Sequence, residues 1–341
     1  MESIKPKATV IIPAFNAQKT LVPCLQAILN QTEKEIEIIV VDDCSTDDTV
    51  VITSQFPVSV IKNSQNFGAG FSRNSGARAA QSDYLLFVDS DVVIPPNGVE
   101  LMLQSLTEKP NTLIVMASYS ENTQHLGFFG DYKNMELSFR LAQLPEYLTY
   151  VSSFFIAIRK KDFFEADGFS ESFKGATVED VEFGYRACQG RAVVLQERKV
   201  QVDHLKEYNF FSLLKTNHSR VKNLLKIRKI HTGKYKAGSD KPISYFLNIC
   251  LSPLIILNLI IFLSSGQFLG SLVAMTGFLF LMNLKLLHFL FDRRGIGFAL
   301  KSFFLIKIEF AGVFISLFTS TLSLSQDSPP NYQDDTQRLR K

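Results

Sequence analysis

The sequence predicts an α/β domain with a parallel sheet, followed by a basic amphipathic helix and a C-terminal transmembrane helical region. Three observations support this prediction. In residues 8–88, short β-branched segments alternate with segments of helical periodicity, which is typical of parallel βαβ units. Residues 242–284 carry no charged side chain, a length sufficient for two membrane passes. Between these regions, residues 206–241 contain ten Lys or Arg and only two Asp or Glu.

Composition and charge exclude several classes of protein. The 341 residues are 46% hydrophobic and 20% charged, which is more apolar than usual for a soluble chain and excludes fibrous, collagen-like and disordered proteins. The net charge is −8 in residues 1–205, +8 in 206–241 and +3 in 242–341. A nucleic-acid-binding protein carries its positive charge on the folded body, so no nucleic acid partner is expected. The basic segment beside the apolar run instead favours contact with anionic membrane lipids.

The cysteines and the first residues of the chain predict where the acidic region resides. Cys24, Cys44, Cys188 and Cys250 are far apart in sequence and have no metal-ligand spacing, so we expect reduced thiols. The polar residues 1–9 are not typical of a signal peptide. We therefore expect the region before residue 242 to lie in the cytosol.

The elements of the α/β domain follow from periodicity and from turn residues. Apolar runs predict strands at 8–12, 36–41, 58–62, 84–88, 113–118, 149–158 and 192–195. Helical spacing predicts helices at 20–30, 47–56, 70–81, 97–108, 131–143 and 178–189. The regular alternation ends after Asp91, which predicts that the second half of the domain departs from simple βαβ repetition.

The C-terminal region is predicted from its apolar spans. Residues 209–239 combine eight Lys or Arg with apolar residues at helical spacing, which is typical of a basic amphipathic interfacial segment. Spans are predicted at 243–263 and 269–291, and a third at 296–324. That third segment contains Lys301, Lys307 and Glu309, so it either spans or begins as an interfacial helix. The predicted domains are 1–205, 206–241, 242–325 with two or three helices, and a polar tail at 326–341.

Polar residues follow three of the predicted strands. These clusters are Pro13–Asn16, Asp42-Asp43 and Asp89-Ser90-Asp91. Ligands of open parallel sheets bind at the carboxyl ends of the strands. Two carboxylates at i and i+2 in such a turn reach one Mg²⁺ or Mn²⁺, which then contacts substrate phosphates. Taken alone, Asp-x-Asp is more often a solvated turn, and Asp42-Asp43 is also a helix N-cap signal.

A series of motifs is more specific than any one of them. VIIPAFNA at 10–17, VVDDCSTDDT at 40–49, NFGAGFSRNSGARAA at 66–80 and LLFVDSDV at 85–92 occur in this order, followed by GFSESFKGATVEDVEFGYRA at 168–187. With these motifs, residues 8–205 resemble family 2 glycosyltransferases of the GT-A fold. The resemblance implies a Rossmann-like nucleotide-sugar-binding domain and a glycosyltransferase activity.

The resemblance also implies roles for individual residues. The positions that hold the base and ribose of the nucleotide-sugar are matched by Pro13, Ala14, Asn16, Asp42 and Asp43. The positions that approach the sugar-diphosphate are matched by Asn66, Gly68 and Arg73.

The same resemblance implies a metal site and a catalytic base. Asp89 and Asp91 match the pair that binds Mg²⁺ or Mn²⁺, and His204 matches a position that completes the metal shell in some relatives. Asp180 matches the catalytic base of an inverting enzyme, with Glu179 beside it at the substrate site. The acidic pair is also compatible with an ordinary helix first turn, which the helix dipole favours.

The sequence departs from the family at two places. Cys44 stands where Gly is usual after the paired aspartates. No Gln-x-x-Arg-Trp follows His204, and the chain contains no Trp. That motif marks the processive polysaccharide synthases, so we expect a non-processive enzyme.

These features predict a membrane-anchored, inverting, metal-dependent glycosyltransferase at the cell membrane, multi-pass, with a cytosolic catalytic domain. It moves a sugar from a nucleotide-sugar, expected to be a UDP-sugar, to a lipid-linked acceptor in cell-envelope glycan or glycolipid synthesis. One alternative is a polyprenyl-phosphate glycosyltransferase, which generally lacks a segment like 168–186. Another is a non-catalytic nucleotide-sugar-binding membrane scaffold, which has no need for Asp91 and Asp180 together.

Overall fold

The computed structural model describes residues 5–109, 111–122, 126–173, 178–231 and 243–324. These residues form two compact units. Unit 1 contains the residues up to Leu126 together with Arg140–Glu207, and unit 2 contains Gly127–Phe139 and the residues from Tyr208 onward. The predicted polar tail at 326–341 and the end of the basic segment, 232–241, lie outside the described residues.

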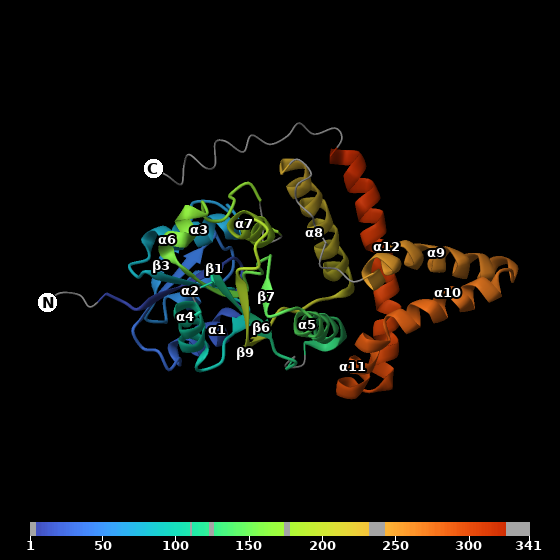
Figure 1. Cartoon of the computed structure of the whole chain (residues 1–341), viewed down its shortest axis with the longest axis horizontal. Helices are drawn as coiled ribbons and strands as arrows, with labels where there is room; N and C mark the ends of the chain where they lie inside the picture. The colour runs from blue at the N-terminus through green and yellow to red at the C-terminus, as the bar shows by residue number, and fades with distance from the viewer. Residues whose placement is uncertain (1–4, 110, 123–125, 174–177, 232–242, 325–341) are drawn as a thin grey trace. The chain divides into compact units, whose positions relative to one another are not determined.

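The first half of unit 1 has the predicted parallel alternation. Strands β1 (Ala8–Ala14), β2 (Ile36–Asp42), β3 (Ser59–Lys62) and β4 (Tyr84–Val88) alternate with helices α1 (Leu21–Leu29), α2 (Thr49–Thr53) and α3 (Ala69–Ala79). Strand β1 pairs in parallel with both β2 and β4, and β2 with β3. Their buried Val and Ile side chains form the core, as expected for strands covered on both faces. Figure 1 shows helices on both faces of this sheet.

The second half of unit 1 makes the sheet mixed. Among the described residues, nine strands form one sheet in the order β3-β2-β1-β4-β8-β6-β9-β5, with β7 paired to β9. Strand β8 is antiparallel to β4 and β6, and β6 is parallel to β9. The added elements are β5 (Val92–Val93), α4 (Gly98–Glu108), β6 (Ile114–Tyr119), β7 (Tyr147–Leu148), β8 (Phe155–Arg159), α6 (Lys160–Glu165), α7 (Glu179–Cys188) and β9 (Val194–His204).

Two strands differ from their predicted lengths. The run at 149–158 forms a strand only over Phe155–Arg159, and the strand predicted at 192–195 continues to His204. In that continuation Val200, Val202 and His204 are buried while the residues between them are more exposed. Their period of two is a strand signal that charged neighbours hide in a search for apolar runs.

Unit 2 is helical. It contains the residues of α5 (Gly127–Ala142) up to Phe139, together with α8 (Phe210–Ile230), α9 (Ile243–Ser265), α10 (Leu269–Met282), α11 (Leu284–Arg294) and α12 (Ile296–Leu324). Helix α8 begins with a capping box in which Asn209 and Ser212 exchange side-chain and backbone hydrogen bonds. This cap gives the predicted basic helix a defined start.

The apolar helices of unit 2 differ from the predicted spans. Of the helices that the structure describes, α9 and α12 are long and apolar enough to cross a membrane. The predicted span at 269–291 is instead the pair α10 and α11, bent by 71° at their junction. At that junction the Asn283 side chain donates to the Leu279 carbonyl at 2.7 Å and to Asn248 Oδ1 at 3.1 Å. The bend therefore coincides with Asn283, two residues before charged side chains return at Lys285.

Candidate functional site

The first two predicted polar clusters meet at the carboxyl ends of β1 and β2. Pro13 and Ala14 end β1, and the Ala14 carbonyl accepts a hydrogen bond from the Asp43 N–H at 2.8 Å. Asn16 adopts a positive φ of 50°, and its side-chain oxygen accepts from the Thr46 N–H at 2.9 Å. The parallel register thus brings together the residues predicted to bind the base and ribose.

The two paired aspartates have different surroundings. Asp43 is buried, and its carboxylate accepts from Asn63 Nδ2 at 2.7 Å, the Phe67 N–H at 3.0 Å and the Gly68 N–H at 2.7 Å. Asp42 is also buried, and among the contacts of the described residues its carboxylate accepts only from the Ser45 N–H, at 3.3 Å. Asp43 therefore shapes the loop before α3, whereas the Asp42 carboxylate keeps more of its hydrogen-bonding capacity for a ligand.

That loop carries two more predicted residues. Asn66 is exposed on it, and Gly68 begins α3 with a φ of 98°. Sequence reasoning missed Asn63, which holds the other side of the loop. Its signal was its place directly after β3, since the other predicted binding residues also follow strands.

The backbone conformation at Cys44 is one that favours Gly. Its φ is 64°, which is the left-handed region that a side chain disfavours by about 1–2 kcal/mol. The turn after β2 therefore keeps its conformation and accepts this cost, with the Cys44 side chain exposed.

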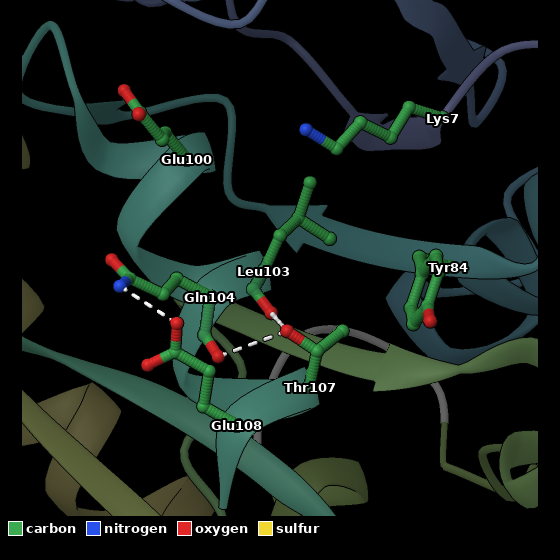
Figure 2. Close-up of a pocket in the computed structure, with 7 residues that line it drawn as sticks. All are labelled: Lys7, Tyr84, Glu100, Leu103, Gln104, Thr107 and Glu108. Carbon is green, nitrogen blue, oxygen red and sulfur yellow. Dashed lines mark hydrogen bonds between the residues drawn. The ribbon is translucent and has the colours of Figure 1, made fainter.

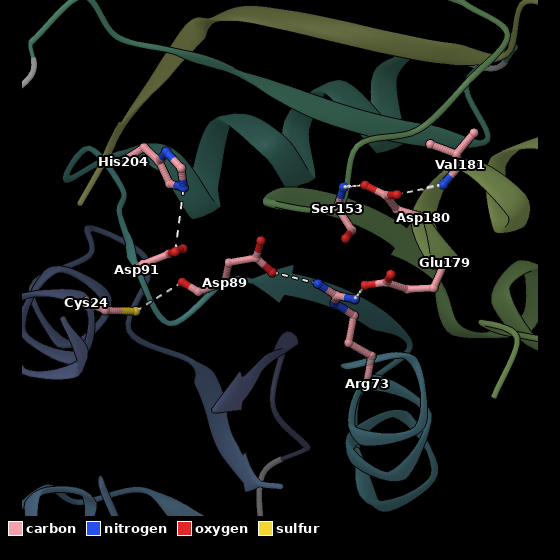
Figure 3. A network of polar contacts seen from close by, with 9 residues as sticks. All are labelled: Cys24, Arg73, Asp89, Asp91, Ser153, Glu179, Asp180, Val181 and His204. Carbon is pink, nitrogen blue, oxygen red and sulfur yellow. Dashed lines mark hydrogen bonds and ion pairs between the residues drawn. The ribbon is translucent and has the colours of Figure 1, made fainter. Parts of the chain in front are cut away.

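Arg73 joins two acidic positions of the predicted site (Figure 3). Its Nη2 lies 2.7 Å from Asp89 Oδ1 and its Nη1 lies 2.9 Å from Glu179 Oε1, while only 2% of the side chain is exposed. Its guanidinium also lies 5.2 Å from the Phe169 ring centroid. Although burial lowers the pKa of Arg73, the two carboxylates raise it above its ordinary value. Arg73 is thus a permanent cation that holds Asp89 and Glu179 in place.

Gly70 permits the close packing behind this network. A Cβ atom at Gly70 would lie 2.7 Å from the Ser170 carbonyl oxygen and 3.6 Å from the Glu179 Cβ. Any larger residue would push α3 away from the segment before α7 and would lengthen the Arg73–Glu179 contact. This Gly belongs to the NFGAGF motif noted in the sequence.

Asp91 and His204 are brought together by a short strand pair. Strand β5 follows Asp91 directly and pairs with β9, which places Val92 opposite His204. His204 Nε2 lies 3.6 Å from Asp91 Oδ2. Burial raises the pKa of Asp91, but the neighbouring imidazole lowers it below its ordinary value. Two residues far apart in sequence therefore share the end of the sheet (Figure 3).

The donor set at this turn fits a hard divalent cation that also binds substrate phosphates. Among the described residues, no group of three His, Cys, Asp or Glu side chains is suited to hold a metal ion by itself. The Asp89 and Asp91 side chains keep 32% and 24% of their surface exposed. Mg²⁺ is commonly held by one or two carboxylates plus water and phosphate oxygens. Two accessible carboxylates are sufficient for this kind of site.

Cys24 lies beside the turn without being a metal ligand. Its Sγ donates to the Asp89 carbonyl at 3.6 Å. Burial raises the pKa of this thiol, and the nearby aspartates raise it further, so the thiol stays protonated. Sequence reasoning gave Cys24 no role, and its position on α1 gave no signal of one.

Asp180 lies at the N-terminal end of α7, near the Arg73 network (Figure 3). Its Oδ2 accepts from the Ser153 N–H at 3.2 Å, and its Oδ1 accepts from the Val181 N–H at 2.7 Å. A helix N-terminus favours the ionised carboxylate. Asp180 is therefore oriented by backbone groups, one of which belongs to Ser153, a residue that sequence reasoning missed.

Glu182, a third acidic residue in the first turn of α7, has a structural role. Glu182 is fully buried and pairs with Arg186, with Nε 2.6 Å from Oε1. Arg186 also donates to the carbonyls of Ala166 and Gly168. This network fixes the turn before α7.

A pocket in unit 1 lies away from all of these residues (Figure 2). It has a volume of about 310 Å³ and is lined by α4 together with Lys7 and Tyr84. Tyr84 is the first residue of β4, whereas Asp89 follows its last residue. Within it, Gln104 bonds Glu108 and Thr107 bonds backbone carbonyls of its own helix. The pocket therefore belongs to the opposite end of β4 and is not part of the predicted site.

Comparison with known proteins identifies the first part of unit 1. Residues 9–167 match the family model described as Glycosyl transferase family 2. An uncharacterised glycosyltransferase of Haemophilus influenzae is 41% identical over 104 residues, which are 30% of this chain and 35% of that protein. The putative teichuronic acid biosynthesis glycosyltransferase TuaG of Bacillus subtilis is 33% identical over 114 residues, 32% of this chain and 45% of that protein. The chain therefore spans less than half the length of these relatives.

A solved structure supports the fold. The mannosyltransferase PcManGT of Pyrobaculum calidifontis, in complex with GDP-Man and Mn²⁺, superposes with a TM-score of 0.61 at 15% identity, over 93% of this chain and 88% of that one. The likeness concerns the fold and confirms the predicted GT-A architecture.

Proposed function

We propose that the chain, whose residues 9–167 match the family model described as Glycosyl transferase family 2, is a membrane-anchored, inverting, metal-dependent glycosyltransferase. It transfers one sugar per binding event from a nucleotide-sugar, expected to be a UDP-sugar, to a lipid-linked acceptor. It is a multi-pass protein of the cell membrane with its catalytic unit in the cytosol.

One observation carries this proposal. The accessible carboxylates of Asp89 and Asp91, the His204 imidazole and the Asp180 carboxylate all gather where β4, β9 and α7 meet (Figure 3). A fold alone does not define an activity, whereas these side chains supply the groups that the reaction needs. A non-catalytic scaffold that binds nucleotide-sugars has no use for an oriented carboxylate at the position of Asp180.

The donor is expected to bind along the ends of β1, β2 and β4. Asn16 and Asp42 face the base and ribose, and Asn66 and the Gly68 loop approach the diphosphate. Asp89 and Asp91, with His204 beside them, would hold Mg²⁺ or Mn²⁺. Such a cation, when bound, neutralises the negative charge that develops on the leaving diphosphate. In this structure Arg73 contacts Asp89 and Glu179, so we assign it to holding the donor-side carboxylate.

The chemical step assigned to this chain's own residues is a proton transfer. Asp180 accepts the proton of the acceptor hydroxyl while the oxygen forms a bond to the anomeric carbon. The bond from that carbon to the diphosphate oxygen breaks on the opposite side, and the anomeric configuration inverts. A placed carboxylate of this kind contributes typically ~10²–10⁴-fold to the rate.

The acceptor and location are inferred from the relatives and from unit 2. TuaG is described as acting in teichuronic acid biosynthesis, and another relative is a poly(ribitol-phosphate) beta-glucosyltransferase of Bacillus spizizenii, 38% identical over 106 residues. These names support a role in cell-envelope glycan synthesis. The apolar helices α9 and α12 support an acceptor held in the membrane, because a soluble acceptor requires no membrane anchor.

The test is a transfer assay on the full chain in lipid vesicles. Labelled nucleotide-sugars are supplied with Mn²⁺ or Mg²⁺ and lipid-linked acceptors, and the product linkage is read by NMR. We expect an inverted linkage and a fall in kcat of about 10²–10⁴-fold for Asp180→Asn, with donor binding retained. A retained configuration, or full activity of the variant, would contradict the mechanism. Transfer to polyprenyl phosphate that is insensitive to Asp180→Asn would favour the alternative, since an ionised phosphate needs no base.

A further inference from the structure

Helix α12 has one exposed face and one buried face. One face is exposed and apolar, with side chains at helical spacing that are 40–65% exposed: Leu300, Phe304, Ile308, Ile315, Phe318 and Leu322. The other face is buried in unit 2 and contains the charged residues Lys307 and Glu309. That buried face is also mostly apolar, since Phe303, Ile306 and Phe310 belong to the hydrophobic core of unit 2.

The charged face of α12 is tied to other helices of unit 2. Glu309 accepts from Tyr132 Oη at 2.7 Å and from Asn217 Nδ2 at 2.9 Å. Lys133 lies 3.8 Å from Glu309, and His218 of α8 contacts Ser316 Oγ at 2.9 Å. Glu309 and Ser316 are in the middle of α12, so α5 and α8 are fixed to its midpoint. Figure 1 shows α8 running alongside α12.

This attachment limits where α12 can lie in a bilayer. If α12 crossed the membrane, its midpoint would lie near the bilayer centre, and Asn217 with it. Lys215 and Arg220 are exposed on α8 within three residues of Asn217, which is about 5 Å along the helix axis. A spanning α12 would thus place two exposed cations deep in the hydrocarbon, where each strongly opposes insertion.

Helix α9 is less buried within unit 2 than α12. In each helix we consider the eighteen consecutive residues that are most apolar. Of these residues, 17% are buried in α9, whereas 56% are buried in α12. Most of the exposed side chains of α9 and α10 are apolar. The Asn258 side chain donates to Ser271 Oγ at 2.6 Å, which joins the two helices. This hairpin carries no charged side chain. It meets the requirements for a membrane-inserted element that α12 does not meet.

We infer that α12 is not a transmembrane span but lies along the membrane interface, with its exposed apolar stripe facing the lipid and its buried face covered by α5, α8 and α9. The α9–α10 hairpin enters the bilayer. The occupant of the stripe is the acyl boundary of a lipid leaflet, and the exposed Lys301 beside the stripe matches anionic headgroups. The basic helix α8 buries its apolar side chains Leu213, Val221 and Ile227 within unit 2. In this arrangement α12 makes the lipid contact that was predicted for α8.

The absence of Trp from the chain permits a direct test of depth. Single Trp variants Leu300→Trp, Ile308→Trp and Phe318→Trp change exposed stripe positions of the full chain. They are reconstituted in vesicles of phosphatidylcholine and phosphatidylglycerol that carry bromine at shallow or deep acyl positions. The matched control is Leu257→Trp, an exposed position in α9. Melting temperature confirms that each variant is folded.

The two arrangements give different quenching patterns. An interfacial α12 predicts that all three stripe positions are quenched mainly by shallow bromines, while the Leu257→Trp control is quenched mainly by deep ones. A spanning α12 places Ile308 near the centre and the other two positions about 12–15 Å away from it along the axis. Deep quenching at Ile308→Trp with shallow quenching at Leu300→Trp and Phe318→Trp would overturn the inference.

This inference rests on the membrane association in the proposed function, and flotation of the wild-type chain with the same vesicles separates the two. Failure to float would overturn both the membrane association and the interfacial helix, while transferase activity would still be measured independently. Flotation with the graded depth pattern would overturn the interfacial helix alone. Flotation with uniform shallow depths supports it.

Discussion

Units 1 and 2 each contain a carboxylate that is held by other side chains, but the two carboxylates differ in their access to solvent. In unit 1, Asp89 pairs with the buried Arg73 and still keeps 32% of its side chain exposed at the end of β4. In unit 2, Glu309 is buried on α12 and both of its oxygens accept hydrogen bonds, from Tyr132 and Asn217. A carboxylate that keeps access to solvent at a strand end can take a ligand, whereas one with both oxygens used fixes the positions of helices.

The largest effect is expected at the accessible carboxylates. Asp91→Asn should lower sugar transfer by about 10³-fold or more, because a bound cation supplies several kcal/mol of transition-state stabilisation. The fold should persist, as read by the melting temperature. The matched control is Asp83→Asn, an exposed residue just before β4 whose partner is Lys5. Equal activity of the two variants would contradict the assignment of the metal site to the carboxyl end of β4.

The next effect concerns the buried cation of unit 1. Arg73→Met leaves the carboxylates of Asp89 and Glu179 without their partner, and should lower the free energy of unfolding by about 3–5 kcal/mol. The control is Arg78→Met on the same helix, where the arginine is 41% exposed and lies 3.6 Å from Glu171. That variant should change the free energy of unfolding by less than about 1 kcal/mol. Similar unfolding free energies for both would show that Arg73 does not hold the site together.

A smaller effect is expected at the carboxylate of unit 2. Glu309→Gln places an amide against one of two donors and should lower the free energy of unfolding by about 1–3 kcal/mol. Donor hydrolysis by unit 1 should continue at the wild-type rate in the folded variant. A loss of hydrolysis comparable to that of Asp91→Asn would contradict the structural role given to Glu309.

The smallest effect concerns membrane charge. Lys301→Gln should weaken binding to anionic vesicles by about 1 kcal/mol, since a basic residue near an anionic leaflet contributes roughly this amount. The loss should vanish in neutral vesicles and at high salt. Lys161→Gln, at an exposed position of unit 1, serves as the control. An equal loss for both variants would indicate a general effect of net charge and no contact at α12.

The sequence predicted the strand ends well and the long-range contacts poorly. The ends of β1, β2 and β4 follow from β-branched runs, so Asn16, Asp42 and Asp89 could be placed together on the edge of a parallel sheet. The contact between Arg73 and Glu179 had no local signal, because it depends on Gly70 letting α3 approach α7. Periodicity therefore predicted which residues follow the strands, but not which side chains hold them in place.

The helices of unit 2 show a related limit. Apolar residues continue past Asn283, so one span was predicted at 269–291 where the structure has two helices bent by 71°. The local signals of the bend were Asn283 and the return of charge at Lys285. For α12, the length and the apolar content of the sequence are compatible with a membrane span. Only the contacts of Glu309 with α5 and α8 reveal that one face belongs to the protein.

The central claim is that Asp89 and Asp91 form, with a divalent cation, the binding site for a nucleotide-sugar. The most direct measurement is the melting temperature of the purified chain with UDP-, GDP- and dTDP-sugars in the presence of Mn²⁺ or Mg²⁺. Ligand binding to the folded state at 100 times Kd stabilises it by about 2.7 kcal/mol. We predict that a nucleotide-sugar with metal raises the melting temperature of the wild-type chain, and that the double variant Asp89→Asn, Asp91→Asn loses this rise. No rise with any donor, or the same rise in the double variant, would contradict the account.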